Sequence, residues 1–259
     1  MILDEIAAKT KVRVAELKEK KPLAEVKAQA AALDPNTGFP FEKALRTDDI
    51  AFICEVKKAS PSKGIIAEDF PYLEIAKDYE AAGASAISVL TEPYYFKGSD
   101  KYLTEIANAV SIPVLRKDFT VDAYQIYEAK IIGASAVLLI CALLDTDTLT
   151  EYLNIAHSLG LSAIVEAHTE QEIQSAVKSG ARIIGVNNRN LKTFDVDITT
   201  SSRLRRLVPD STIFISESGI KTAADIAVLR GNKTNAVLIG ETFMRSPDKK
   251  KMLAELRGN

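Results

Sequence analysis

Three stretches of the sequence repeat one pattern, and they decide the fold: GASAISVL (83–90), GASAVLLI (133–140) and GARIIGVN (180–187). In each, a glycine follows an amphipathic segment of helical length and precedes a run rich in β-branched residues. Glycine just after a helix readily takes the left-handed conformation that ends the helix. The three stretches therefore predict the same helix-to-strand junction.

Outward from these junctions, short apolar runs alternate with helix-length segments along the chain. The predicted strands are 51–57, 86–91, 112–117, 136–140, 162–166, 183–187, 212–217 and 236–240, and the predicted helices between them include 71–82, 122–132, 147–159, 170–179 and 222–229. Apolar strands joined by helical crossovers predict a parallel sheet covered on both faces. Eight such units without an interrupting linker favour a closed (β/α)₈ TIM barrel over a doubly wound sheet.

The chain of 259 residues has the usual length of one such barrel, so we expect residues 1–259 to form a single domain. Residues 1–48 precede the first strand and alternate charge and hydrophobe at helical spacing. They predict an N-terminal helical extension, docked through Ile2, Leu3, Ile6 and Leu17.

Composition excludes several classes of protein. With a net charge of −2 and a pI near 5.9, the protein has no positive electrostatic field that would attract nucleic acid non-specifically. The longest apolar run, 136–144, is about half of what a membrane-spanning helix needs, and the N-terminus has no signal-peptide core. We therefore expect a cytoplasmic protein that binds neither nucleic acid nor membrane. The sequence of the outer helices shows no recognisable hydrophobic patch that would stabilise a dimer. We therefore expect a monomer or a weak homodimer.

Cysteine and histidine usage narrows the chemistry further. Cys54 and Cys141 are too few for a disulfide framework and are expected to be buried, reduced thiols. With only His157 and His168, a histidine-rich metal site or a Ser-His-Asp triad is disfavoured. His168 is interpreted as a hydrogen-bonding loop residue. We expect no metal and no cofactor.

Charged side chains gather where the predicted strands end, which is where (β/α)₈ enzymes carry their sites. Period-two alternation places Glu55 and Lys57 on one face of the first strand and Val56 on the other. The same count gives inward or mouth-facing positions to Leu115, Lys117, Phe119, Ile164, Glu166, Asn187, Arg189 and Glu217. Because buried charges are costly unless paired, this gathering predicts catalysis.

The alternative is that these charges form ion pairs that only close the barrel top. Arg116 and Asp118, which alternate out of the mouth, are interpreted as structural, facing the helices or pairing with each other.

The predicted loops add binding groups. Residues 60–64 form either a mobile linker or a lid whose hydroxyls reach a polar substrate, and Gly219 and Gly240 allow backbone N–H groups to approach an anion such as phosphate. Aromatic residues beside the charged mouth make a flat aromatic substrate plausible; they are Tyr94, Tyr95, Phe96 and Phe119.

These motifs together resemble the indole-3-glycerol phosphate synthases. The resemblance rests on EVKKASPSKG (55–64), SVLTEP (88–93), FKGS (96–99), LRKDF (115–119), VEAH (165–168), GVNNRNL (185–191), SESGI (216–220) and LIG (238–240). It implies decarboxylating, dehydrating ring closure of 1-(2-carboxyphenylamino)-1-deoxyribulose 5-phosphate to indole-3-glycerol phosphate, in tryptophan biosynthesis.

The resemblance also implies catalytic roles. Lys117 is the general acid on the C2′ carbonyl oxygen, and Glu166 and Lys57 share the acid and base of the dehydration, in a division that the sequence leaves open. Glu55 holds the lysines and raises their pKa. Glu217 acts likewise or binds substrate hydroxyls.

The remaining implied roles concern binding. Asn187 and Arg189 hold polar groups of the substrate, Ser60, Ser218, Gly219 and Gly240 bind the phosphate, and Phe96, Phe119, Leu138, Leu191 and Ile239 line the anthranilate pocket. Glu241 departs from relatives that have serine there: its backbone N–H still serves the phosphate, but its carboxylate must turn away.

Two other functions compete with this one. In a class I aldolase, Lys117 or Lys57 would form a Schiff base, which requires a neutral lysine and is disfavoured by neighbouring glutamates. The second competing function is that of a catalytically inactive barrel that senses a phosphorylated ligand. The presence of the complete set of Lys57, Lys117 and Glu166 disfavours it.

Overall fold

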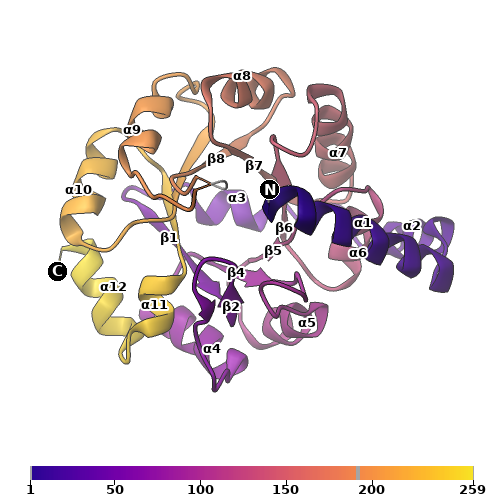
Figure 1. The fold of residues 1–259 in the computed structure, drawn as a ribbon, viewed down its shortest axis with the longest axis horizontal. Coiled ribbons are helices and arrows are strands. Elements are labelled where there is room, and N and C mark those ends of the chain that lie inside the picture. The colour runs from indigo at the N-terminus through magenta and orange to yellow at the C-terminus, as the bar shows by residue number, and fades with distance from the viewer. Residues whose placement is uncertain (1, 191–192, 259) are drawn as a thin grey trace.

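Parallel strands close into a barrel at the centre of the structure (Figure 1). The computed structural model describes residues 2–190 and 193–258, and within them eight strands pair in the cyclic order β1-β10-β9-β8-β7-β6-β5-β4. Their bounds are β1 Ala51–Val56, β4 Ala86–Leu90, β5 Val114–Lys117, β6 Ala136–Ile140, β7 Ser162–Ala167, β8 Ile183–Asn187, β9 Ile213–Glu217 and β10 Ala236–Ile239. The predicted (β/α)₈ barrel is confirmed, and the predicted strands differ only at their ends.

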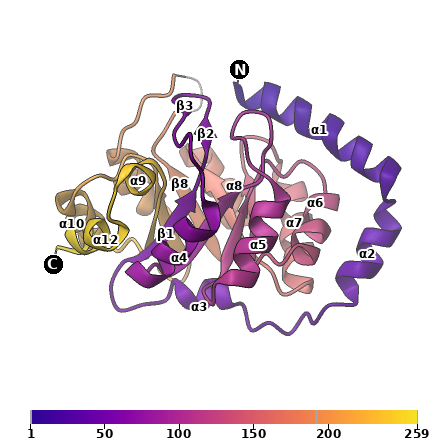
Figure 2. The ribbon, with the colours of Figure 1, turned by 90° about the horizontal axis from the view of Figure 1, so that it is seen from below.

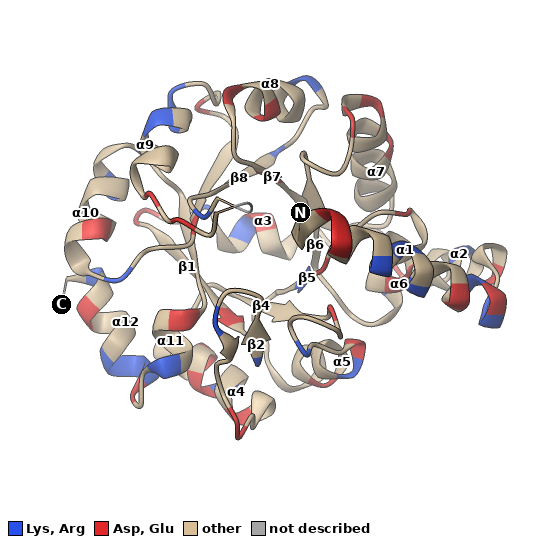
Figure 3. Ribbon diagram, viewed as in Figure 1, with Lys and Arg blue, Asp and Glu red and all other residues tan. Residues whose placement is uncertain are grey.

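Helices form a ring around this barrel (Figure 1). They are α4 Tyr72–Ala82, α5 Asp100–Ala109, α6 Tyr124–Ile131, α7 Thr146–Ser158, α8 Glu170–Lys178, α9 Thr199–Arg205, α10 Ala223–Gly231, α11 Glu241–Arg245 and α12 Lys249–Arg257. In Figure 3, basic and acidic residues are interspersed along these helices. No described helix is both long enough and apolar enough to cross a membrane.

The repeated helix-to-strand junctions have the expected backbone. Gly83, Gly133 and Gly180 have φ angles of 93°, 91° and 83°, in the left-handed region where glycine alone is unstrained. Each lies just beyond a helix and turns the chain into the next strand.

Strand alternation separates an inner from an outer core. Ile53, Leu115 and Ile164 belong to the cluster inside the barrel, whereas Val56 and Val165 pack in the cluster between the barrel and its helices. The outward direction predicted for Val56 is confirmed. The period-two geometry of a strand thus assigns each residue either to the interior or to the helix layer.

The N-terminal segment touches the barrel at both ends. Its helices are α1 Ile2–Lys20, α2 Leu23–Ala31 and α3 Pro40–Ala44. Figure 2 shows α3 at the opposite end of the barrel from the beginning of α1. Phe41 of α3 and Leu45 just after it join the inner barrel cluster.

The predicted contact side of α1 is largely correct. Leu3 and Ile6 are buried, whereas Ile2 and Leu17 are half-buried. Leu17 packs against a small cluster of Val14, Val26 and Tyr124 that joins α1, α2 and α6.

Two expectations need correction. Part of the segment 60–64, expected as a loop, belongs to an antiparallel hairpin of β2 (Ala59–Ser60) and β3 (Gly64–Ile65). Cys54 is fully buried, but Cys141 is only partly buried, because it lies beyond the end of β6. Both are free thiols, and burial raises the pKa of each.

Gly98 provides a test of packing beside the end of β4. A Cβ atom at this position would overlap the carbonyl oxygen of Leu90 and lie 2.8 Å from the backbone nitrogen of Thr91. The backbone would have to shift to make room for this methyl group, and such shifts are costly in free energy. We therefore expect Gly98→Ala to lower the free energy of unfolding, measured by urea denaturation, by about 1–3 kcal/mol.

Gly231 is the matched control, because a Cβ there meets nothing within 4 Å and Gly231 ends helix α10. Gly231→Ala should leave the free energy of unfolding unchanged or raise it by up to about 1 kcal/mol. Equal effects of the two substitutions would contradict the packing argument.

Candidate active site

A cavity of about 810 Å³ opens at the carboxyl ends of the barrel strands. The β2–β3 hairpin and the beginning of α1 lie at this end of the barrel (Figure 2). Sixteen of the described residues that the sequence nominated line this cavity, whereas Tyr94 and Tyr95, expected beside the mouth, do not; the sixteen are Glu55, Lys57, Ser60, Phe96, Lys117, Phe119, Leu138, Glu166, Asn187, Arg189, Glu217, Ser218, Gly219, Ile239, Gly240 and Glu241. Leu191 lies outside the described residues. The fold therefore gathers this set, while the role of each member stays a prediction.

Lys117 lies among acidic side chains at the end of β5. Its Nζ is 3.5 Å from Glu166 Oε2 and 3.8 Å from Glu217 Oε2. Burial lowers the pKa of the ammonium, but the charges of Glu166, Glu217 and Glu55 outweigh this and raise the pKa of Lys117. Lys117 is consequently a protonated donor.

Glu166 and Glu217 are both 2% exposed and titrate differently. Burial, followed by the charge of Glu166, raises the pKa of Glu217 to about 8. Burial acts in the same direction on Glu166, but Lys117 and His168 overcome it, so the pKa of Glu166 is lowered. One of the two carboxyl groups is thus ionised and the other protonated at neutral pH.

Glu55 and Lys57 form an ion pair at the end of β1, two residues apart on one strand face. Glu55 is 4% exposed, so its charge is almost entirely balanced by lysine rather than by water. This pair supplies a second ammonium to the cavity.

Two glycines without side chains leave room for these carboxylates. A Cβ atom on Gly185, in β8, would overlap Glu217 Oε1 and lie 3.0 Å from Ile164 Cγ2. On Gly240, it would overlap Glu55 Oε1 and lie 2.8 Å from Lys57 Nζ. Gly185 was not nominated from the sequence, although its place two residues before Asn187 puts it on the same strand face.

A buried network holds the turn after β9. Asn188 Nδ2 donates to Ser216 Oγ at 3.0 Å and to the Ser218 carbonyl at 3.1 Å, and its Oδ1 accepts from the Ser201 backbone at 3.0 Å. This fixes Ser218 and Gly219, whose φ angles are 68° and 83°. Asn188 was not nominated from the sequence, because strand alternation points it away from the mouth.

Arg189 is held by its own loop. Its backbone N–H donates to Asn187 Oδ1 at 3.0 Å, and its guanidinium donates to the Phe194 carbonyl at 3.2 Å. Phe194 and Val196 also line the cavity, which the sequence analysis did not foresee.

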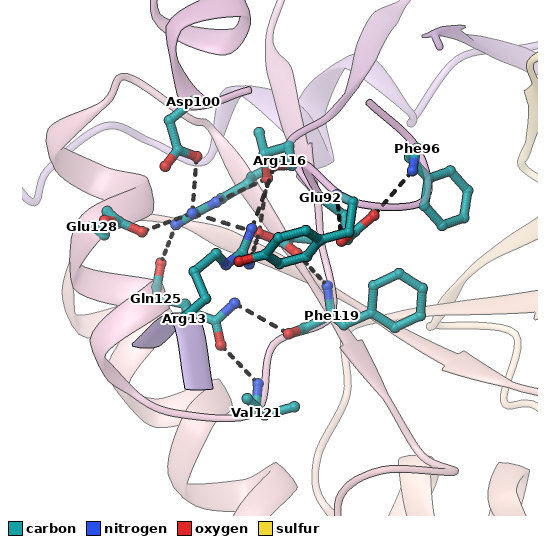
Figure 4. Close-up of polar contacts among 12 residues, drawn as sticks. Arg13, Glu92, Phe96, Asp100, Arg116, Phe119, Val121, Gln125 and Glu128 are labelled. Atoms are coloured by element: carbon teal, nitrogen blue, oxygen red, sulfur yellow. Dashed lines mark hydrogen bonds and ion pairs between the residues drawn. The ribbon is translucent and has the colours of Figure 1, made fainter. Parts of the chain in front are cut away.

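Buried carboxylates fix the aromatic wall of the cavity (Figure 4). Phe96 and Phe119 pack with ring centroids 5.9 Å apart. Glu92, fully buried, accepts from the backbone N–H groups of Tyr94, Tyr95 and Phe96 at 2.9, 2.7 and 3.0 Å. Glu92 therefore sets the loop that carries Phe96, a role the sequence analysis missed.

Arg116 and Asp118 pair behind this wall, as the structural interpretation proposed. Arg116 Nη2 is 3.6 Å from Asp118 Oδ2, and it also contacts Asp100 at 2.9 Å and Glu128 at 2.7 Å (Figure 4). Asp118 accepts from the Phe119 backbone at 2.8 Å. The two charges that alternate out of the mouth thus brace the strand that carries Lys117.

Helix α1 closes one side of the cavity with Ile2, Leu3 and Ile6. The ion pair of Arg13 with Asp118, at 2.7 Å, ties this helix to the loop after β5. The sequence predicted the docking of these residues but not their place at the site.

Glu241, whose carboxylate was expected to turn away, pairs with two basic residues that line the same cavity. Glu241 Oε1 lies 3.1 Å from Arg245 Nε and 3.9 Å from Lys63 Nζ. These pairs balance the extra negative charge beside Gly240.

The two histidines have different surroundings. Burial, and then the charge of Arg182, lower the pKa of His157 to about 4. The prediction that His168 is a hydrogen-bonding loop residue is confirmed. Its Nδ1 lies 3.3 Å from Glu172 Oε2, and its backbone N–H donates to the same oxygen at 2.6 Å. Among residues 2–190 and 193–258, no three His, Cys, Asp or Glu side chains are placed to hold a metal ion.

Comparison with known proteins agrees with this geometry. A family model described as indole-3-glycerol phosphate synthase matches residues 3–256. A protein of that name from Ruminiclostridium cellulolyticum is 64% identical over all of both chains, and one from Endomicrobium trichonymphae is 58% identical over 99% of this chain and all of that one. A crystal structure of 3-hexulose-6-phosphate synthase, 16% identical, has a TM-score of 0.63 over 81% of this chain and 99% of that one, a likeness of fold alone. The chain belongs to the indole-3-glycerol phosphate synthase family.

Proposed function

We propose that this protein closes 1-(2-carboxyphenylamino)-1-deoxyribulose 5-phosphate to indole-3-glycerol phosphate, with loss of CO₂ and water, as a step of tryptophan biosynthesis. One observation carries the assignment of the chemistry: the Lys117 ammonium lies between the almost fully buried carboxyl groups of Glu166 and Glu217, in a cavity that Phe96 and Phe119 also line. A cation in such a site polarises a carbonyl oxygen strongly because little water screens it.

Lys117 acts as general acid in ring closure. The aromatic carbon attacks the C2′ carbonyl, and the developing alkoxide takes a proton from Nζ. Loss of CO₂ then restores aromaticity, so the electrons need no cofactor as a sink. The raised pKa of Lys117 supports this role and disfavours a Schiff base, which needs a neutral amine.

Lys57 and Glu166 divide the dehydration between them. Glu166, whose pKa is lowered, is ionised and serves as the base that removes the C1′ proton. Lys57, paired with Glu55, is the acid that protonates the departing hydroxyl. Glu217, protonated near neutral pH, donates to a substrate hydroxyl.

The rest of the cavity binds the two ends of the substrate. Phe96, Phe119 and Leu138 contact the anthranilate ring, together with Leu191 and Ile239, and Arg189 pairs with its carboxylate. The phosphate is bound by Ser60, Ser218, Gly219, Gly240 and the backbone N–H of Glu241. We also propose that the protein acts in the cytoplasm as a monomer or weak homodimer, without metal, cofactor or nucleic acid.

Replacing the acid tests the reaction directly. Lys117→Ala should lower kcat/KM by about a hundredfold or more, because the alkoxide loses its proton donor. Product formation is followed by indole fluorescence. Lys58→Ala is the control, since Lys58 directly follows the cavity residue Lys57 in the sequence but does not itself line the cavity. If Lys117→Ala retained full activity, the acid role would pass to Lys57; if the unaltered protein formed no product, the ligand-sensing alternative would be favoured.

The pH dependence tests Glu217. Because its pKa is about 8, the carboxyl group loses its proton as the pH rises through that value. We expect kcat/KM to fall above about pH 8 and the Glu217→Gln variant, which stays neutral, to lack that decline. Glu16→Gln, at an exposed position of α1, should keep the decline. The same alkaline limb in the Glu217→Gln profile would exclude Glu217 as its source.

Replacing Gly185 tests whether the position of the Glu217 carboxyl group matters for the reaction. Gly185→Ala should reduce kcat/KM by about tenfold or more, since the added methyl group displaces the Glu217 carboxylate from Lys117. Gly231→Ala serves as control, and circular dichroism checks that both variants fold. Unchanged kinetics in Gly185→Ala would mean that the position of Glu217 does not matter for the reaction.

A further inference from the structure

The groups assigned above to the substrate's phosphate carry no positive charge. They are the hydroxyls of Ser60 and Ser218 and backbone N–H groups at Gly219, Gly240 and Glu241, all of which line the cavity. A phosphate monoester carries a charge of about −1.5 to −2 near pH 7. The Glu241 carboxylate adds a further negative charge beside it, so this end of the cavity needs cations to bind the phosphate.

Three basic residues of the cavity belong to the segments around these groups. Lys63 is in the β2–β3 hairpin, Lys221 follows the turn after β9, and Arg245 is on α11. The two lysines at the strand ends, Lys57 and Lys117, pair instead with buried glutamates. Lys63, Lys221 and Arg245 therefore lie outside the catalytic ion pairs.

Lys63 connects the hairpin with α11. Its backbone N–H donates to the Ser60 carbonyl at 3.3 Å, so Lys63 lies in the turn that begins at a proposed phosphate ligand. Its Nζ is 3.9 Å from Oε1 of Glu241, the first residue of α11. The ion pair of Lys63 with Glu241 thus reaches from one side of the proposed phosphate site to the other.

Arg245 lies beside the same carboxylate. Its Nε donates to Glu241 Oε1 at 3.1 Å, four residues earlier on the helix. Thr242 Oγ1 donates to the Ile220 carbonyl at 3.1 Å, which joins the first turn of α11 to the turn that carries Gly219. One carboxylate oxygen therefore gathers two cations, from two different elements, next to the glycines assigned to the phosphate.

These ion pairs are able to exchange partners. The side chains of Lys63, Glu241 and Arg245 are 46%, 33% and 54% exposed, and ion pairs with this much access to water are weak. A phosphate dianion carries more charge than a carboxylate and offers more oxygens to a guanidinium. It therefore competes with Glu241 for both cations.

We propose that Lys63 and Arg245 are further phosphate-binding residues, and that Glu241 holds them at the site until the substrate's phosphate replaces it as their counter-ion. The Arg245 guanidinium then donates to phosphate oxygens, the Lys63 ammonium binds from the hairpin, and the Glu241 carboxylate turns to water. Lys221 adds to the positive potential. The inference deepens the proposed function and rests on it, because it takes the phosphate to lie beside Gly240.

Binding of inorganic phosphate to the full chain tests this without any turnover. Lys63→Gln and Arg245→Gln should each raise the dissociation constant about three- to tenfold in isothermal titration calorimetry, because each removes a charge-assisted contact. Glu241→Gln should lower the dissociation constant about twofold or more, because the competing carboxylate is gone and both cations remain. Titrations with sodium chloride at equal ionic strength correct for screening by salt.

Helix α12 supplies matched controls. Lys251 and Glu255 form an ion pair at 3.9 Å with i,i+4 spacing, and neither residue lines the cavity. Lys251→Gln and Glu255→Gln change the net charge of the protein by the same amounts as the test substitutions. They should leave the affinity for phosphate unchanged, and circular dichroism checks that every variant folds.

Steady-state kinetics provide a second readout. Lys63→Gln and Arg245→Gln should raise KM about three- to tenfold and change kcat by less than about twofold, because neither side chain reaches the reacting atoms. Inorganic phosphate should compete with the substrate, and its inhibition constant should shift in the same direction as its dissociation constant in each variant.

Unchanged affinity for phosphate in Lys63→Gln or in Arg245→Gln would overturn the role of that residue. Weaker binding in Glu241→Gln would overturn the exchange of counter-ions, since it would mean that the carboxylate only braces α11 and the hairpin. If the unaltered protein binds phosphate and the variants respond as expected but no product forms, the proposed function fails while the phosphate-binding roles stand.

Discussion

Pairing of buried charge at the carboxyl end of the barrel is the constraint on which the site depends. Two ammonium groups, Lys57 and Lys117, face three almost fully buried carboxyl groups, Glu55, Glu166 and Glu217. If all three carboxyl groups were ionised, the poorly hydrated set would carry a net negative charge. The carboxyl group that the two ammonium groups compensate least is the one that takes up a proton. That is Glu217, whose pKa is about 8 and which takes up a proton. The set is then neutral, and it holds three proton donors, Lys57, Lys117 and Glu217, beside the ionised carboxylate of Glu166.

The barrel makes this arrangement possible because the carboxyl ends of four strands meet there: Glu55 and Lys57 come from the end of β1, Lys117 from β5, Glu166 from β7 and Glu217 from β9. Period-two alternation points Glu55, Lys117 and Glu166 inward, while the residues between them bury apolar side chains under the helices. Space is the second requirement, and Gly185 and Gly240 supply it. A side chain on either would occupy the volume of a carboxylate oxygen. Strand direction and local absence of a side chain therefore fix the charges together.

The sequence predicted whatever depends on local pattern. Alternation predicts which side chains at the strand ends point inward, and helix termination predicts the three junction glycines. The barrel and the inward charges could therefore be expected before the structure. The missed features depend on contacts between distant segments. Glu92 is an exception, because it accepts from the turn only two to four residues ahead of it. Asn188, by contrast, joins β8 to the turn after β9, and Ile2 reaches the cavity only because α1 lies across its edge (Figure 1). No periodicity in the sequence reports such contacts.

The placement of α1 links the N-terminal segment with the wall of the cavity. Its first turns supply apolar wall to the cavity, and its middle is tied by Arg13 to Asp118, which also holds the backbone of Phe119. Asp118 in turn contacts Arg116, the neighbour of Lys117 on the other side of the strand. The buried Asp118 carboxylate thus contacts α1, the loop that carries Phe119 and the strand that carries Lys117. A buried polar network that is only partly satisfied is less stable than a fully satisfied one, so the loss of one of these contacts weakens the others, and α1 and the Lys117 strand are held in place together.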